Sequence, residues 1–332
     1  MPARLSVCAE ADRLLAIGAV AQAVTLIEVA GARDDADALN HLALWRVYGE
    51  PLARDFRAAR ELFQRAGLVG HKSAALKHAV FVALGAGDEP DWRQALQLLN
   101  DAARGDPEAA RQRAIIDAMA IDDQGVPRIV PSATQTSTAP RVKVLRALFT
   151  PAECTHLTDL ATPLLTPSMV ADPTSGRLVP HPIRTSDGAV LGPIQQDLVV
   201  HALNKRIAFV TGTRIEQGEP LSVLRYSPDQ QYRLHHDCLP GEANQRVITV
   251  IVYLNDSFGG GATVFPALGH SFRGSIGDAI LFHNVLRNGQ PDERARHAGA
   301  PVSSGTKWIC TRWIRARDFD PWGLRLQRSI DA

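Results

Sequence analysis

The sequence predicts an α+β protein, in which an N-terminal α-helical repeat region precedes a β-sandwich or jelly-roll barrel. The first ~120 residues are alanine-rich, follow the helical period and resemble one another at a fixed spacing. A Pro-, Ser- and Thr-rich stretch without periodicity follows. Short β-branched or aromatic runs, separated by glycine and proline, fill the rest. A chain of 332 residues is long enough for two domains.

Alanine and leucine recur at a constant spacing in the helical region. "DFRAARELFQRAG" (55–67) aligns with "DWRQALQLLNDAARG" (91–105) at a spacing of 36 residues, and "AVTLIEVAG" (23–31) is a weaker copy 36 residues upstream. The matched positions are Ala23, Ala59 and Ala95; Leu26, Leu62 and Leu98; and Ala30, Ala66 and Ala102. Small alanines let paired helices approach closely, while Leu and Phe fill the seam.

The stretch from Ala9 to Ala120 resembles the Sel-type helical repeats, which are relatives of tetratricopeptides. Repeats of this kind usually bind other proteins, so we expect a protein partner here; an ordinary helical bundle that braces the second half is the other interpretation. The predicted organisation is a helical repeat domain over 1–121, a linker over 122–141 ("DDQGVPRIVPSATQTSTAP") and a second domain over 142–332.

The second domain begins with a capped helix and continues as strands. Thr150 is the expected N-cap, Pro151 fits the first helical position and Glu153 closes a capping box. The expected strands include "LSVLRY" (221–226), "RVITVIVYL" (246–254), "DAILFH" (278–283) and "TKWICTRWI" (306–314).

Charge and cysteine content argue against several classes of partner. Lys and Arg (36) nearly balance Asp and Glu (35), which gives no basic excess for nucleic acid or a membrane surface. The four scattered cysteines form no CxxC pair, as is typical of reduced thiols. The apolar stretch "LLAIGAVAQAV" (14–24) is too short to span a bilayer. We therefore expect a cytoplasmic protein.

The segment "QYRLHHDCLP" (231–240) contains a candidate metal-binding pair. Side chains alternate along a strand, so His235 and Asp237 share a face and His236 points away. Such a triplet is common by chance, and a third ligand is needed. The histidines downstream are His270, His283 and His297.

Two imidazoles and one carboxylate form the facial triad of non-haem Fe(II) oxygenases, although zinc hydrolases use similar ligands. The chemistry is narrowed by Lys307, which opens an apolar strand ten residues after His297. The side chains that share its face are Ile309, Thr311 and Trp313. A buried lysine needs an anionic partner. The distal carboxylate of 2-oxoglutarate fits, with its 2-oxo acid end on the iron.

Residues from about Arg146 to Arg317 resemble the prolyl 4-hydroxylase family of Fe(II)/2-oxoglutarate dioxygenases. The resemblance rests on "LRYSPDQQYRLHHD", "RVITVIVYLND", "GGGATVFP", "GDAILF" and "RHAGAPVSSGTKWICTRWI", in this order. It implies a dioxygenase domain folded as a double-stranded β-helix (jelly roll) with flanking helices. It also implies Fe(II), 2-oxoglutarate and O₂ as cofactor and co-substrates, with ascorbate as a candidate accessory.

The resemblance assigns roles residue by residue. It implies His235, Asp237 and His297 as iron ligands, and Lys307 as the anchor of the co-substrate carboxylate. Tyr226 and Thr249 match positions in the 2-oxoglutarate pocket. Four further residues match positions near the substrate: Arg184, Glu219, Tyr232 and Trp313.

Three functional hypotheses follow. In the first, the protein hydroxylates a prolyl or other amino-acid residue of a peptide or protein, and the repeats recruit the target. In the second, the substrate is a free amino acid or a small peptide natural product. In the third, the protein is a repeat-based interaction module with an inactive barrel, which the intact ligand set disfavours.

Overall fold

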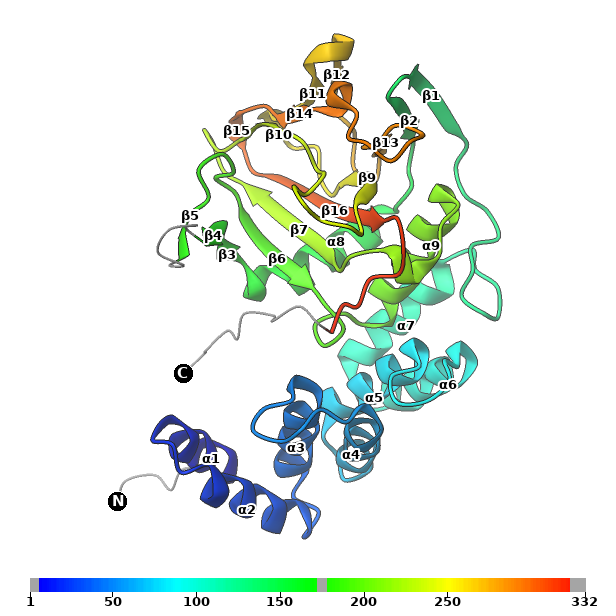
Figure 1. Cartoon of the computed structure of the whole chain (residues 1–332). Coiled ribbons are helices and arrows are strands. Elements are labelled where there is room, and N and C mark those ends of the chain that lie inside the picture. The colour runs from blue at the N-terminus through cyan, green and yellow to red at the C-terminus, as the bar shows by residue number, and fades with distance from the viewer. Residues whose placement is uncertain (1–5, 172–177, 323–332) are drawn as a thin grey trace. The chain divides into compact units, whose positions relative to one another are not determined.

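The computed structural model describes residues 6–171 and 178–322 (Figure 1). Contacts divide the chain into two units. The first comprises Met1–Gly125 and Asp197–His201, and the second comprises Val126–Gln196 and Ala202–Ala332. Each unit is described by itself below.

The first unit is helical. Its helices are α1 (Val7–Ala16), α2 (Val20–Gly31), α3 (Ala36–Tyr48), α4 (Phe56–Leu68), α5 (Lys72–Leu84), α6 (Trp92–Ala103) and α7 (Pro107–Ala118). Helices α2, α4 and α6 begin at Val20, Phe56 and Trp92, again 36 residues apart. The aspartates at N-caps 55 and 91 accept hydrogen bonds from main-chain N–H groups of the first turn. None of the helices in the described residues has the length and apolar character to cross a bilayer.

The spaced residues of these helices differ in burial. Ala23, Ala59 and Ala95 are fully buried, as expected for positions of close helix approach. The matched leucines at 26, 62 and 98 are only half-buried. The seam is filled one residue later, by the fully buried Ile27, Phe63 and Leu99. Position i+4 from each alanine lies on the same helix face, whereas i+3 turns slightly toward solvent.

The second unit is built of antiparallel strands. One sheet has the order β1 (Ala133–Thr138), β2 (Arg141–Leu145), β13 (Ala279–His283), β9 (Arg246–Tyr253), β16 (Lys307–Arg315), β7 (Leu221–Tyr226), β6 (Asp187–Leu191) and β3 (Thr166–Pro167). A second has β12 (His270–Phe272), β11 (Thr263–Phe265), β14 (His297–Gly299) and β8 (Tyr232–His235). Two strand pairs are β10 (Phe258–Gly260) with β15 (Val302–Gly305), and β4 (Met169–Ala171) with β5 (Leu178–Pro180). The four strands expected from the sequence appear as β7, β9, β13 and β16.

Helical elements flank these sheets. They are α8 (Pro151–Ala161) and α9 (Leu198–Thr211), with short 3₁₀ turns η1 (Thr162–Leu164), η2 (Ile215–Gln217), η3 (Pro266–Leu268) and η4 (Glu293–Ala295). The predicted capping box at the start of α8 is confirmed. Thr150 Oγ1 accepts from the Glu153 N–H and the Glu153 carboxylate accepts from the Thr150 N–H. The same buried carboxylate forms a two-bond ion pair with Arg206, at 2.7 and 2.8 Å.

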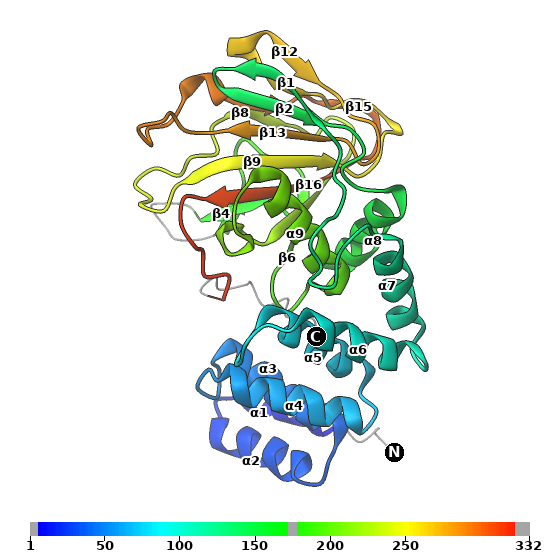
Figure 2. The same cartoon turned by 90° about the vertical axis from the view of Figure 1, so that its right-hand side faces the viewer.

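Strand β1 lies inside the segment expected to be a linker. It pairs with β2, and Figure 2 shows β1, β2, β13, β9 and β16 side by side in the large sheet. Five of its six residues are exposed, so no apolar alternation marks this edge strand in the sequence. Residues 133–138 of the expected linker thus form a strand, in a segment where threonines favour extended backbone.

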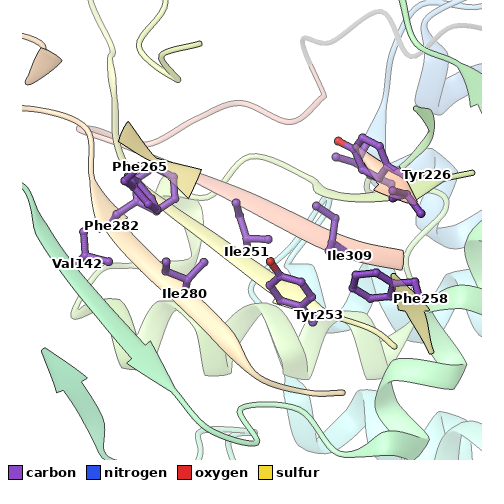
Figure 3. Packing of buried hydrophobic residues seen from close by; sticks show 11 residues of the cluster. Val142, Tyr226, Ile251, Tyr253, Phe258, Phe265, Ile280, Phe282 and Ile309 are labelled. Atoms are coloured by element: carbon purple, nitrogen blue, oxygen red, sulfur yellow. The ribbon is translucent and has the colours of Figure 1, made fainter. Parts of the chain in front are cut away.

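The main core of this unit joins the large sheet to strands β10, β11 and β15 (Figure 3). From the large sheet come Tyr226, Ile251, Tyr253, Ile280, Phe282 and Ile309, while Phe258, Phe265 and Val302 come from β10, β11 and β15. Apolar surface removed from water contributes about 25 cal/mol per Å² to the free energy of folding. Burial of these large side chains therefore holds the layers at a fixed separation. That separation sets the positions of the side chains described next.

Candidate active site

A partly open cavity lies in the second unit. Strands β7, β8, β9, β11, β14 and β16 supply most of its lining. Eight of the ten site residues expected from the sequence line it: Tyr226, Tyr232, His235, Asp237, Thr249, His297, Lys307 and Trp313. Arg184 and Glu219 do not belong to this lining.

Strand register explains how distant residues meet. His297 of β14 lies opposite His235 of β8. On β16, Lys307 lies opposite Tyr226 of β7, and Trp313 lies opposite Thr249 of β9. Lys307, Ile309, Thr311 and Trp313 all face the cavity, which confirms the alternation expected for this strand.

His235, Asp237 and His297 form a buried cluster whose candidate ligand atoms lie within 4.8 Å of one another. Asp237 Oδ1 is 3.7 Å from His235 Nε2, and Oδ2 is 3.8 Å from His297 Nε2. Of the three downstream histidines, only His297 joins this cluster; His270 is exposed on β12 and His283 is half-buried at the end of β13.

The backbone route to this cluster differs from strict strand alternation. Strand β8 ends at His235, and Asp237 lies in the bend beyond it. The intervening His236 accepts a hydrogen bond from the Cys238 N–H at Nδ1, so Nε2 is protonated and donates to the Asp292 carbonyl. His236 therefore stays out of the cluster because its ring holds the bend.

Hydrogen bonds leave both imidazoles of the cluster ready to bind a metal. Nδ1 of His235 contacts the Arg233 carbonyl at 2.8 Å, and Nδ1 of His297 contacts the Ala295 carbonyl at 3.1 Å. A carbonyl only accepts, so the ring proton lies on Nδ1 and the Nε2 lone pair faces Asp237. Burial, reinforced by charge on His297, lowers the pKa of His235 to about 4. Burial also lowers the pKa of His297.

Asp237 supplies the negative charge of the cluster. Burial acts to raise its pKa, but charge attraction to His297 and His235 in their protonated forms and the hydrogen bond from the Thr249 hydroxyl outweigh it and hold the pKa below its ordinary value. An ionised carboxylate beside two neutral imidazoles is the donor set that a divalent first-row metal such as Fe(II) requires. The residues present therefore fit an iron ion.

Lys307 places a cation in the same cavity. The side chain is 2 % exposed, and among the described residues it pairs with no carboxylate; Nζ donates to the Gly261 carbonyl at 2.6 Å and lies 5.3 Å from the ring centres of Tyr226 and Tyr253. Burial lowers the pKa of Lys307 to about 8. An anion bound here would restore the favourable environment of the ammonium group.

Gly261 is a site residue that sequence reasoning missed. Its φ of +65° favours glycine, and a Cβ there would lie 3.0 Å from Lys307 Cδ. The run of three glycines was the available signal, although glycine runs mark turns generally. Thr263 of β11 also lines the cavity, but its hydroxyl bonds to the Tyr253 hydroxyl and to none of the candidate ligands.

Two tyrosines shape the cavity wall. Burial raises the pKa of Tyr226 to about 12, so its hydroxyl stays protonated, and that hydroxyl bonds to Ser186. The ring of Tyr232 stacks on His235, with centroids 3.5 Å apart and planes inclined by 14°. Tyr232 therefore restricts rotation of the imidazole.

The two remaining expected substrate residues lie behind the cavity wall. Arg184 donates to Ser168 Oγ, and its guanidinium lies 5.6 Å from the ring centre of Tyr232. Both carboxylate oxygens of buried Glu219 are bonded to Arg246, and one also to Arg315. Three hydrogen bonds from two arginines thus hold the Glu219 carboxylate, and its expected place near the substrate stays a prediction. The guanidinium carbon of Arg246 in turn lies over the ring of Trp313, 4.0 Å from the ring centre.

A cluster of two imidazoles and a carboxylate beside the buried ammonium group of Lys307 defines a candidate metal site with a candidate anion-binding residue next to it. The family model "2OG-Fe(II) oxygenase superfamily" matches residues 221–315. Prolyl 4-hydroxylase 1 of Arabidopsis thaliana is 37 % identical over 200 residues, which is 54 % of this chain and 71 % of that protein. The chain belongs to this family of prolyl 4-hydroxylase-like 2-oxoglutarate- and Fe(II)-dependent oxygenases. Enzymes of the family use Fe(II), 2-oxoglutarate and O₂.

Two solved structures are similar to separate parts of the chain. The viral collagen prolyl hydroxylase of Paramecium bursaria Chlorella virus-1 is 26 % identical, with a TM-score of 0.44, over 53 % of this chain and 96 % of that chain. A Sel1 repeat protein of Oxalobacter formigenes is 24 % identical, with a TM-score of 0.27, over 29 % of this chain and 41 % of that chain.

Proposed function

We propose that this protein is a hydroxylase that acts on a prolyl or other amino-acid residue of a peptide or protein, with oxidative decarboxylation of 2-oxoglutarate. The observation that carries the proposal is the presence of the three-residue ligand cluster and the unpaired Lys307 in one cavity. The names of the curated relatives, which are prolyl 4-hydroxylases, support the substrate class.

In this proposal His235, Asp237 and His297 hold Fe(II) from one side. Lys307 receives the distal carboxylate of 2-oxoglutarate, and the protonated hydroxyl of Tyr226 offers it a hydrogen bond. Together with 2-oxoglutarate and O₂, bound iron supplies the oxidising power for C–H hydroxylation, with succinate and CO₂ as the other products. The apolar side chains around the cluster limit water access.

The substrate side of the cavity is assigned to Tyr232 and Trp313, with Arg184 behind Tyr232. An amphipathic aromatic wall suits a peptide that presents one flat side chain to the metal. We also propose that the two main sheets form the two halves of a jelly roll. The helical unit is proposed to recruit the target protein through its repeats.

The test uses the purified full chain with Fe(II), ascorbate and 2-oxoglutarate. Proline-containing peptides, the same peptides with alanine in place of proline, and free proline are supplied in parallel. The expected result is succinate formation together with a gain of one oxygen on proline-containing peptides only. Oxygen gain on free proline alone would replace the peptide with a small-molecule substrate.

The ligand assignment is tested by His297→Ala, with His283→Ala as the matched control. His297→Ala is expected to abolish succinate formation, because one of three metal ligands is lost. His283 lies outside the ligand cluster, so its variant is expected to keep the activity. Retained activity in His297→Ala would show that the metal site is assigned wrongly.

A further inference from the structure

Asn284 lies directly behind the metal-binding carboxylate without lining the cavity. It follows β13, and its side chain is fully buried. Its amide Nδ2 donates to Thr249 Oγ1 at 2.9 Å, and Thr249 Oγ1 donates to Asp237 Oδ2 at 2.6 Å. A side-chain relay thus connects Asn284 to a predicted metal ligand.

The direction of this relay is settled by the chemistry of its members. A threonine hydroxyl has one proton, and an ionised carboxylate can only accept. The proton of Thr249 therefore points at Asp237, and only a donor can face the remaining lone pairs of the hydroxyl. The amide N–H of Asn284 is that donor. An acceptor in its place would compete with Asp237 for the proton.

The relay also gives the two carboxylate oxygens of Asp237 different hydrogen bonding. Thr249 occupies Oδ2, whereas Oδ1 accepts no hydrogen bond from any residue in the described ranges. One oxygen is thus held and the other is left for a ligand bond. Because the fixed oxygen sets the rotation of the carboxylate, the relay determines where Oδ1 points.

We propose that Asn284 is a positioning residue for the metal site, which acts on Asp237 only through the hydroxyl of Thr249. The inference rests on the proposed metal site. The main chain of Asn284 adds a separate link, because its carbonyl accepts from the Asp292 N–H, in the segment that leads to His297. Substitution of the side chain leaves that main-chain bond in place and removes only the relay.

The test is a calorimetric titration of the full-length apoprotein with Mn(II) alone, without 2-oxoglutarate. Thr249→Val and Asn284→Leu are each expected to raise the Kd for Mn(II) by about ten- to a hundredfold, as is typical when an outer-shell partner is lost. The double variant is expected to bind no more weakly than Thr249→Val alone, because the side chain of Asn284 reaches Asp237 only through the Thr249 hydroxyl. Thr249→Ser retains the hydroxyl and is expected to restore the affinity.

Thr263→Val is the matched control. Thr263 is also a buried cavity threonine, but its hydroxyl bonds to the Tyr253 hydroxyl, 3.0 Å away, and to no predicted ligand. Its variant is expected to keep the wild-type Kd for Mn(II). Asn284→Ala is measured beside Asn284→Leu. The inference is judged on the Kd for Mn(II) of the variant whose metal-free melting temperature is closer to that of the wild type.

Two outcomes overturn the inference. One is a wild-type Kd in the Asn284 variants; the other is a double variant whose loss equals the product of the two single losses. If neither Asn284 variant folds, the residue is a structural brace and the inference also fails. Failure of the wild-type protein to bind Mn(II) would instead overturn the proposed metal site itself.

Discussion

Lys307 is buried as a cation whose hydrogen bond goes to a main-chain carbonyl. A position so costly for a charge is retained where an anionic ligand completes it. The surroundings of Lys307 therefore favour an anionic ligand independently of the similarity to other proteins. They also make the binding of 2-oxoglutarate sensitive to pH.

We predict that the affinity for 2-oxoglutarate decreases above about pH 8. The pKa of Lys307 in the free protein is lowered to about 8, so the fraction of ammonium falls above that pH. A carboxylate binds the ammonium form, so the apparent Kd should rise about tenfold per pH unit beyond the pKa. Titrations of the Mn(II)-loaded protein between pH 7 and pH 10 measure this. A Kd independent of pH would argue against Lys307 as the anchor.

Substitution of Lys307 should weaken the binding of 2-oxoglutarate without weakening the binding of the metal. Lys307→Met keeps most of the apolar stem and removes the charge, so the Kd for 2-oxoglutarate should rise by two orders of magnitude or so, as for a lost charge-assisted bond of about 3 kcal/mol. The Kd for Mn(II) alone should stay near wild type. Equal loss of both affinities would show that Lys307 supports the fold rather than the ligand.

Gly261 allows a comparison of backbone strain with contact. Gly261→Ala and Gly269→Ala both introduce a side chain at positive φ, +65° and +60°, and the backbone strain should cost each about 1 kcal/mol of stability, to which Gly261→Ala adds a 3.0 Å approach to Phe258 Cε2. Only Gly261 has Lys307 within reach, since nothing lies within 4 Å of a Cβ at Gly269. We therefore expect weaker 2-oxoglutarate binding in Gly261→Ala alone. Similar binding in both variants would contradict the role given to Gly261.

Helix α8 illustrates how a local signal becomes part of a wider network. The capping box follows from the local sequence around Thr150 and Glu153, and the structure has it as expected. The ion pair of Glu153 with Arg206 of α9 could not be expected, because the partners lie 53 residues apart. The carboxylate therefore has two partners, and its loss should cost more than the loss of the cap.

We predict different stability losses for the two members of the box. Thr150→Ala should lower the free energy of unfolding by about 1 kcal/mol, the usual value of an N-cap. Glu153→Ala should lower it by about 3 to 5 kcal/mol, because Arg206 is left as a buried unpaired charge. Urea denaturation measures both, with the exposed Thr155→Ala on the same helix as the control. Equal losses for Thr150 and Glu153 would show that the ion pair adds nothing.

The expected site residues and the repeated helices lie in different units. All ten expected site residues belong to the second unit, and the first unit holds helices whose starts recur every 36 residues. Under the proposed function, the helical unit binds the target and the second unit carries out the chemistry. This division is tested by separating the units.

A chain that begins at Val126 is expected to bind Mn(II) and 2-oxoglutarate like the full protein. Its melting temperature should be lower, because Asp197–His201 groups with the helical unit and loses those neighbours. Activity on a protein target should fall more than activity on a short peptide if the helices recruit the target. Loss of metal binding in a folded truncation would make the helices part of the site.

Local pattern was sufficient for much of this protein. Helices α2, α4 and α6, the cap of α8 and the strands β7, β9, β13 and β16 follow from periodicity and turn residues, because these depend on neighbours within a few positions. The order of residue types, "HHD" followed by a later histidine and lysine, narrowed the chemistry, and the resemblance of the longer motifs to the prolyl 4-hydroxylase family named it. Edge strand β1 escaped because its exposed side chains leave no apolar period.

The tertiary structure alone decided which distant atoms meet. It brings His297, which the family resemblance had implied, opposite His235 through the register of β14 with β8, and it leaves His270 and His283 outside the cluster. It places Asp237 in the cluster through a bend after β8 rather than through strand alternation. It also surrounds the Glu219 carboxylate with Arg246 and Arg315. It brought Asn284 behind Asp237 across 47 positions of chain. Such contacts depend on strand order and register, which are fixed by the packing of the whole core and leave no mark at any one position of the sequence.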